Sequence, residues 1–158
     1  MGGGSASVGH TRDAYRLGEL IAEQEWILLN GGRNSGIMDA SAHGARSRGG
    51  LTIGILPDAN TLRASRHISI PIITGMGSAR NCINVLTSDV VVACHGGAGT
   101  LSEIALALKS NKAVILLHYE KDPIFENYFR AGRLSYADSP EAVIAEIKAI
   151  LQRSGGME

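Results

Sequence analysis

The fold of this chain is decided by the stretch Val90-Val91-Val92-Ala93-Cys94-His95-Gly96-Gly97-Ala98-Gly99-Thr100-Leu101-Ser102-Glu103. It opens with a continuous apolar run, typical of a strand that is buried on both faces of a parallel sheet. A helix-like segment follows over residues 101–108. The glycines in between let the backbone approach a ligand closely and leave the N–H groups at the helix start free to face it. Such a place favours an anion, most often a phosphate.

Outside this stretch, helix-like and strand-like segments alternate along the chain. Helices are predicted over residues 12–25, 36–48, 78–87, 123–130 and 140–152. Strands are predicted over residues 26–30, 51–56, 68–74, 89–94 and 113–118. Pro71 places the strand 68–74 at or near a sheet edge. The alternation predicts an α/β fold, a Rossmann-like doubly wound parallel sheet with helices on both faces, in one domain over residues 1–158.

The chain begins with Met1-Gly2-Gly3-Gly4-Ser5-Ala6-Ser7, which has the make-up of a loop that follows a first strand. In this architecture the first strand normally lies in the middle of the sheet. We therefore expect a first strand upstream of Gly2, either because the native protein begins earlier or because the chain is truncated.

Composition excludes several classes of function. The 158 residues are 44% apolar and 19% charged, which is ordinary for a globular domain. The net charge is zero, so no global field attracts nucleic acid or an anionic membrane, and aromatic residues make up only 4%. Cys82 and Cys94 lie in apolar surroundings, which predicts buried thiols of a cytoplasmic protein rather than a disulfide.

Four glycine-containing loops are expected at the carboxyl edge of the sheet, where ligands bind in this architecture. They are Gly2 to Ser7, Asn30 to Gly36, Thr74 to Asn81, and the glycine stretch after Cys94. Together they predict one phosphate-binding pocket, with the candidate contacts Gly3, Gly4, Ser5, Ser7, Gly32, Arg33, Asn34, Ser35, Gly36, Gly75, Gly77, Ser78, Arg80, Asn81, Gly96, Gly97, Ala98, Gly99, Thr100 and Glu103. The loops lack the P-loop lysine and the dinucleotide spacing, which disfavours ATP hydrolysis and NAD chemistry. No histidine pair has zinc spacing, and no metal site is predicted.

Three of these side chains allow two interpretations. Arg33 and Arg80 each offer a guanidinium fork that can clamp a phosphate, but either one could instead pair with a carboxylate at the surface. Glu103 follows Thr100 at capping-box spacing, so it could cap its helix. It could equally be a carboxylate at the mouth of the pocket, acting as a general base or holding a ribose-like hydroxyl.

Two of the motifs resemble those of the "lonely guy", or lysine decarboxylase-like, proteins of the SLOG superfamily. The stretch from Gly96 to Glu103 resembles their Pro-Gly-Gly-x-Gly-Thr-x-x-Glu signature, and the stretch from Gly31 to Met38 resembles their earlier glycine motif. The resemblance spans almost the whole chain. It implies a Rossmann-like fold, assembly into dimers or larger oligomers, and hydrolysis of the N-glycosidic bond of a nucleoside 5′-monophosphate, with Glu103 and Arg80 as catalytic residues.

The chain departs from that pattern at three positions. His95 replaces the signature proline, Arg33 replaces a glycine, and Asp39 stands where a glycine is usual. With the glycine-rich start, these changes are most similar to the molybdenum cofactor carrier branch of the superfamily. That resemblance implies a non-catalytic homodimer or homotetramer that binds and protects the phosphate-bearing pterin. Its recipients would be molybdoenzymes or cofactor insertion proteins.

Three functions therefore remain open at this point. They are a molybdenum cofactor carrier, a nucleoside 5′-monophosphate phosphoribohydrolase and a nucleotide-sensing module. All three require the same phosphate-binding loops, so the loops alone do not choose among them.

Overall fold

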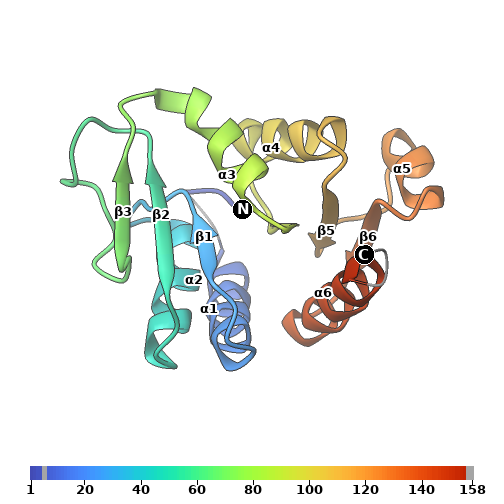
Figure 1. Ribbon diagram of the computed structural model, residues 1–158, viewed down its shortest axis with the longest axis horizontal. Helices are drawn as coiled ribbons and strands as arrows, with labels where there is room; N and C mark the ends of the chain where they lie inside the picture. The colour runs from blue at the N-terminus through green and yellow to red at the C-terminus, as the bar shows by residue number, and fades with distance from the viewer. Residues whose placement is uncertain (5–6, 156–158) are drawn as a thin grey trace.

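The computed structural model describes residues 1–4 and 7–155. These residues contain two three-stranded parallel sheets (Figure 1). The first has the order β1-β2-β3, with the bounds Leu28–Asn30, Thr52–Leu56 and Ile70–Ile73. The second has the order β4-β5-β6, with the bounds Val90–Ala93, Ala113–Leu117 and Leu134–Ala137. This arrangement confirms the predicted Rossmann-like α/β class.

Helices cover both faces of the two sheets (Figure 1). On one side lie α1, α2 and α6, with the bounds Val8–Glu23, Gly36–Ser47 and Pro140–Gly155. On the other side lie α3 and α4, with the bounds Asn81–Thr87 and Ala98–Lys109. The short elements are η1, η2 and α5, with the bounds Gly77–Arg80, Pro123–Phe125 and Glu126–Arg130. Each face has its own buried apolar cluster, one centred on α1 and α6 and the other on α3 and α4.

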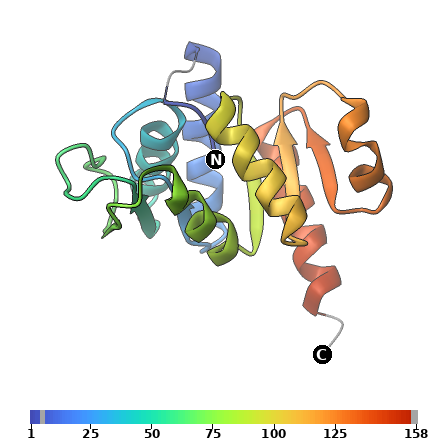
Figure 2. The same ribbon diagram turned by 90° about the horizontal axis from the view of Figure 1, so that it is seen from above.

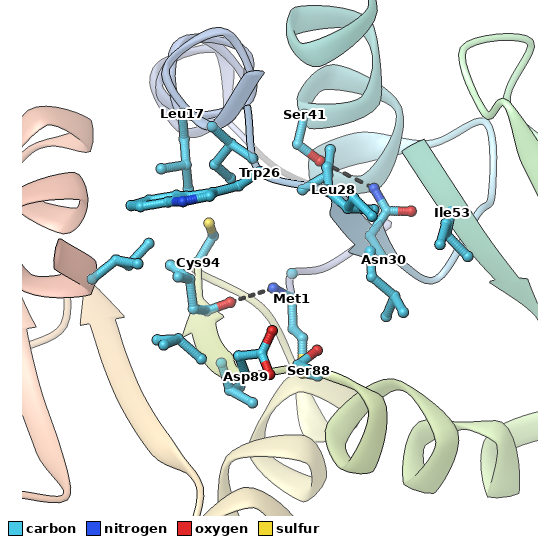
Figure 3. Close-up of a pocket in the computed structure, with 18 of the residues that line it drawn as sticks. Met1, Leu17, Trp26, Leu28, Asn30, Ser41, Ile53, Ser88, Asp89 and Cys94 are labelled. Carbon is cyan, nitrogen blue, oxygen red and sulfur yellow. Dashed lines mark hydrogen bonds between the residues drawn. The ribbon is translucent and has the colours of Figure 1, made fainter. Parts of the chain in front are cut away.

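The two sheets meet at a gap between β1 and β4, and the N-terminus lies in it (Figures 1 and 2). Met1 pairs with β4 as a strand residue would: its amino group donates to the Val92 carbonyl, and the Cys94 N–H donates to the Met1 carbonyl at 2.7 Å. Met1 therefore lies along the edge of β4 that faces β1 (Figure 3).

Helices α1 and α2 pack against each other through two glycines. A Cβ atom on Gly18 would lie 2.1 Å from the Ser41 carbonyl oxygen, and one on Gly44 would lie 1.9 Å from the Tyr15 carbonyl oxygen. Both distances are far below van der Waals contact, so any side chain at either position would push the helices apart. This contact fixes α1 directly against α2.

The structure corrects some details of the sequence interpretation. It confirms the position of Pro71 on an edge strand, because β3 pairs only with β2 among the described strands. It adds β6, which was not predicted, and it divides the helix predicted over residues 78–87 into η1 and α3. Cys82 is exposed, contrary to expectation, whereas Cys94 is buried. None of the described helices combines the length and the apolar character that a membrane crossing requires.

Candidate functional site

The ends of the glycine loops enclose a cavity of about 260 Å³, called here the loop cavity. It lies where the chain leaves the carboxyl ends of β1, β3 and β4, the edge at which ligands bind in doubly wound folds. Its walls are Met1, Gly2, Gly3, Gly4, Gly31, Met38, Arg80, Asn81, Gly97, Gly99, Thr100 and Glu103. Each of the four predicted loops contributes to this cavity.

Backbone hydrogen bonds tie three of the loops together. The Gly3 N–H donates to the His95 carbonyl at 3.2 Å, and the Ile37 N–H donates to the Gly3 carbonyl at 3.1 Å. Gly36 has a φ of +53° and approaches so closely that a Cβ there would lie 2.4 Å from the Gly3 oxygen. Only glycine meets both demands, so Gly36 allows the start of α2 to lie directly against Gly3.

The start of α4 forms one wall and is not capped by the protein. Its N-cap residue is Gly97, and no side chain donates or accepts a capping hydrogen bond there. The N–H groups of a first helical turn have no partners within the helix, and the helix dipole is positive at that end. A Cβ built on Gly97 or Gly99 would meet nothing within 4 Å. The absent side chains therefore leave open space for a ligand against these N–H groups.

Arg80 supplies a cation without a partner. Its Nε is buried without a hydrogen bond, and no carboxylate within the described part of the chain forms an ion pair with it. Its two terminal nitrogens lie against Gly31, where a Cβ would sit 2.5 Å and 2.6 Å from them. Burial lowers the pKa of Arg80, and the charge of Glu103 opposes that shift. An arginine remains protonated in proteins, so a desolvated positive charge faces the cavity.

Glu103 is a buried carboxylate and not a helix cap. Helix α4 begins at Ala98, so Glu103 lies beyond its first turn and the predicted capping box with Thr100 does not form. Glu103 is 7% exposed and accepts a hydrogen bond from the Asn84 side-chain amide at 3.0 Å. Asn84 is itself 1% exposed, and its Oδ1 has no hydrogen-bond partner among the described residues. The sequence interpretation missed Asn84. The signal was available, because Asn84 comes four residues after Arg80, and this spacing places both on one face of the helix predicted over residues 78–87.

Arg33 lies outside the loop cavity and already has a partner. Its guanidinium donates twice to Asp58, from Nε at 3.0 Å and from Nη2 at 2.7 Å. This pair lowers the pKa of Asp58 and raises that of Arg33. The two arginines of the glycine loops therefore differ: the charge of Arg33 is neutralised within the protein and that of Arg80 is not.

The structure brings together eight of the predicted contacts around the loop cavity: Gly3, Gly4, Arg80, Asn81, Gly97, Gly99, Thr100 and Glu103. Ser5 lies outside the described residues. Ser7 instead caps α1, where its hydroxyl accepts from the His10 N–H at 3.3 Å. The other predicted contacts do not line this cavity: Gly32, Arg33, Asn34, Ser35, Gly36, Gly75, Gly77, Ser78, Gly96 and Ala98. Met1, Gly2, Gly31 and Met38 line it without having been predicted.

Solved structures of known function share this fold over nearly the whole chain. The molybdenum cofactor binding protein from the phototrophic bacterium Rippkaea orientalis is 49% identical, with a TM-score of 0.85 over 93% of this chain and 91% of that chain. The molybdenum cofactor carrier protein from Chlamydomonas reinhardtii is 41% identical, with a TM-score of 0.84 over 96% of this chain and 94% of that chain.

A more distant relative is the cytokinin riboside 5′-monophosphate phosphoribohydrolase of Mycobacterium tuberculosis. It is 34% identical over 93 residues, which are 58% of this chain and 50% of that protein. The profile of the SLOG cluster4 family matches residues 1–144, a range that holds all six strands and both glycine motifs. These findings confirm the resemblance indicated by the motifs, and the chain belongs to the SLOG cluster4 family.

Proposed function

We propose that this protein binds the molybdenum cofactor by its phosphate in the loop cavity and carries it without chemical change. The observation behind the proposal is Arg80, a desolvated guanidinium without a carboxylate partner among the described side chains. A phosphate would supply the missing negative charge, and a guanidinium fork binds it with two hydrogen bonds. The uncapped start of α4 forms part of the same cavity and would stabilise the same charge.

Two further observations support a bulky phosphate-bearing ligand. Gly97 and Gly99 leave room for it at the helix start, and Asn81 and Thr100 bring polar side chains to the same walls. The proteins from R. orientalis and C. reinhardtii, which are named for molybdenum cofactor, align with more than nine-tenths of this chain. A carrier of this kind would deliver the cofactor to molybdoenzymes or to cofactor insertion proteins.

The test is equilibrium binding of isolated molybdenum cofactor, followed by its rate of oxidation in the bound state. We expect saturable binding and slower oxidation. Arg80→Gln should weaken binding at least about tenfold, since it removes a charge-assisted bidentate contact. Arg130→Gln is the matched control, because Arg130 forms an exposed pair with Glu126 far along the chain from the loops. Absence of saturable binding by the parent protein would remove the proposal.

A second candidate function rests on Glu103. A buried carboxylate beside an arginine in a cavity of about 260 Å³ is suited to hydrolysis of a nucleoside 5′-monophosphate, the activity in the name of the M. tuberculosis relative. Release of adenine from AMP by the parent, lost in Glu103→Gln, would favour this enzyme over the carrier. A nucleotide that raises the thermal midpoint without any release of base would instead favour a sensing module.

A further inference from the structure

Four ring-bearing side chains gather at the carboxyl ends of β4 and β5. We call them the ring cluster: His10, His95, His118 and Tyr119. His95 follows β4, whereas His118 and Tyr119 follow β5. His10 lies in the first turn of α1 and brings a third element to the same place. The carboxyl ends of the strands are where ligands bind in doubly wound folds, so this cluster lies on the functional edge of the sheet.

Stacking is the interaction that the ring cluster already makes. The ring centroids of His10 and His95 are 4.6 Å apart, and their interplanar angle is 12°. The Tyr119 ring lies 6.2 Å from the His95 ring at an angle of 31°. The His118 ring lies 6.4 Å from the His10 ring at an angle of 32°. A row of rings therefore leads from His118 through the stacked pair to Tyr119.

Hydrogen bonds fix the two ends of this row and leave its middle open. The His118 ring donates from Nε2 to Asp13 at 2.9 Å, and the Tyr119 hydroxyl donates to the Cys94 carbonyl at 3.2 Å. The His95 ring has no hydrogen-bond partner in the part of the chain that the structure describes, although the residue is exposed. His95 is therefore held by stacking alone and remains open to a ligand.

His95 also joins the ring cluster to the loop cavity. Its carbonyl accepts from the N–H of Gly3, which is one wall of that cavity. Gly97, another wall, follows two residues later, so the Cα atoms of His95 and Gly97 lie no more than about 7 Å apart. None of the residues that line the loop cavity carries a ring. A flat ring joined to a phosphate in the cavity would find a stacking partner at His95, just outside it.

Metal coordination is another common use of histidine clusters. Among the described residues, no group of three or more His, Cys, Asp or Glu side chains is placed to hold an ion. The rings of His and Tyr also serve as platforms on which nitrogen heterocycles stack. The parallel pair of His10 and His95 has the geometry for that second use.

We propose that the ring cluster binds the flat nitrogen heterocycle of the phosphate-bearing ligand, which stacks on His95 and extends the row of rings. The heterocycle is a fused two-ring system of the pterin or purine class. This proposal rests on the proposed function only in placing the phosphate in the loop cavity. It gives a role to the position at which the chain departs from the Pro-Gly-Gly signature, because a proline would offer no aromatic face there.

The test measures equilibrium affinity for three kinds of probe. AMP and isolated molybdenum cofactor carry a ring system and a phosphate, neopterin carries the ring system alone, and inorganic phosphate carries no ring. His95→Ala should weaken binding of each ring-bearing probe that the parent binds by about tenfold or more. Its affinity for inorganic phosphate should stay within about twofold of the parent. Comparison of AMP with the cofactor shows whether the heterocycle is a purine or a pterin.

Two further variants make the result specific. His95→Phe keeps a flat ring, so its affinity for the ring-bearing probes should stay within about threefold of the parent. His43→Ala is the matched control, because His43 is also an exposed histidine that stacks on another, His67, at 4.1 Å. It belongs neither to the ring cluster nor to the walls of the loop cavity, so its affinities should equal those of the parent.

Proton NMR adds a readout that does not depend on affinity. A heterocycle that stacks on His95 should shift the Cε1–H signal of this residue upfield through its ring current. The shift is expected on addition of AMP or neopterin and not on addition of inorganic phosphate, and loss of the signal in His95→Ala assigns it.

The outcomes separate this proposal from the proposed function. Equal affinity of the parent and His95→Ala for the ring-bearing probes would overturn the ring cluster, even if the cofactor binds. An equal loss for inorganic phosphate would also overturn it, because His95 would then only shape the phosphate loop, and so would failure of every ring-bearing probe to bind the parent. If AMP or neopterin binds through His95 and the cofactor does not bind, the carrier proposal falls and the ring cluster stands.

Discussion

The two arginines of the glycine loops differ in whether a neighbouring carboxylate neutralises their charge. Arg33 and Arg80 are indistinguishable as loop arginines in the sequence. In the structure one is bonded twice to Asp58 and the other has a buried nitrogen without a partner. Sequence spacing could not reveal that Arg33 pairs with Asp58, because Asp58 follows a different strand. Whether its side chain reaches Arg33 depends on the path of the backbone over residues 57–64.

The Arg33–Asp58 pair predicts a component of acid sensitivity. Because the pair lowers the pKa of Asp58 below its ordinary value of 3.8, it stabilises the protein above that pH, and the contribution is lost as the pH falls through the lowered pKa. The thermal midpoint of the parent should therefore fall more steeply below pH 4 than that of Asp58→Asn. Parallel midpoint curves for the two proteins would contradict this expectation.

Arg33→Gln should leave cofactor affinity within about twofold, since the pair lies outside the cavity.

Asn84 is predicted to stabilise the buried carboxylate of Glu103. Asn84→Ala leaves that carboxylate without its hydrogen bond, which should cost about 1–3 kcal/mol in the free energy of unfolding. Urea denaturation measures the change. Because the bond to a charged acceptor is the stronger one, the loss should be smaller when Asn84→Ala is made on a Glu103→Gln background. Equal losses on both backgrounds would show that the two side chains are not coupled.

At the scale of elements, two glycines on two helices should respond in opposite ways to the same change. Gly44→Ala would place a methyl group against the Tyr15 carbonyl oxygen of α1. This should lower the free energy of unfolding by at least about 1–3 kcal/mol. Gly99→Ala places a methyl group in open space within α4, where alanine favours the helix by about 0.5–1 kcal/mol. The proposed ligand would then meet that methyl group.

The expected outcome is a lower unfolding midpoint and retained cofactor affinity for Gly44→Ala. For Gly99→Ala we expect an unchanged or higher midpoint with weakened affinity. Chemical denaturation and equilibrium binding of the isolated cofactor measure the two properties separately. Loss of stability in Gly99→Ala would mean that this glycine serves packing rather than access to the cavity.

Most elements were predictable because their apolar periodicity is local. The strand β6 was not, since Leu134-Ser135-Tyr136-Ala137 is short and half polar, and it becomes a strand through pairing with β5. The capping box between Thr100 and Glu103 was wrong because α4 begins at Ala98, three residues earlier than its apolar pattern indicates.

At the scale of the whole molecule, assembly stays a prediction. The resemblance to the superfamily implies a homodimer or homotetramer, and the described surface carries exposed apolar side chains on the edge strand β3: Ile70, Ile72 and Ile73. Sedimentation equilibrium should give a mass two or four times the 16.6 kDa of the chain. A single species at 16.6 kDa over the micromolar range would contradict this expectation.

Met1 lines the loop cavity and also a second cavity, of about 460 Å³, between β1 and β4, and this bears on how the protein should be produced. A purification tag fused to the N-terminus puts a flexible polar chain beside this second cavity and next to Gly2 and Gly3, which line the loop cavity. We therefore expect the affinity for isolated molybdenum cofactor to differ between N-terminally tagged and untagged protein. A tag that follows α6 is the better choice, because Leu151 is the last residue of that helix to line the second cavity.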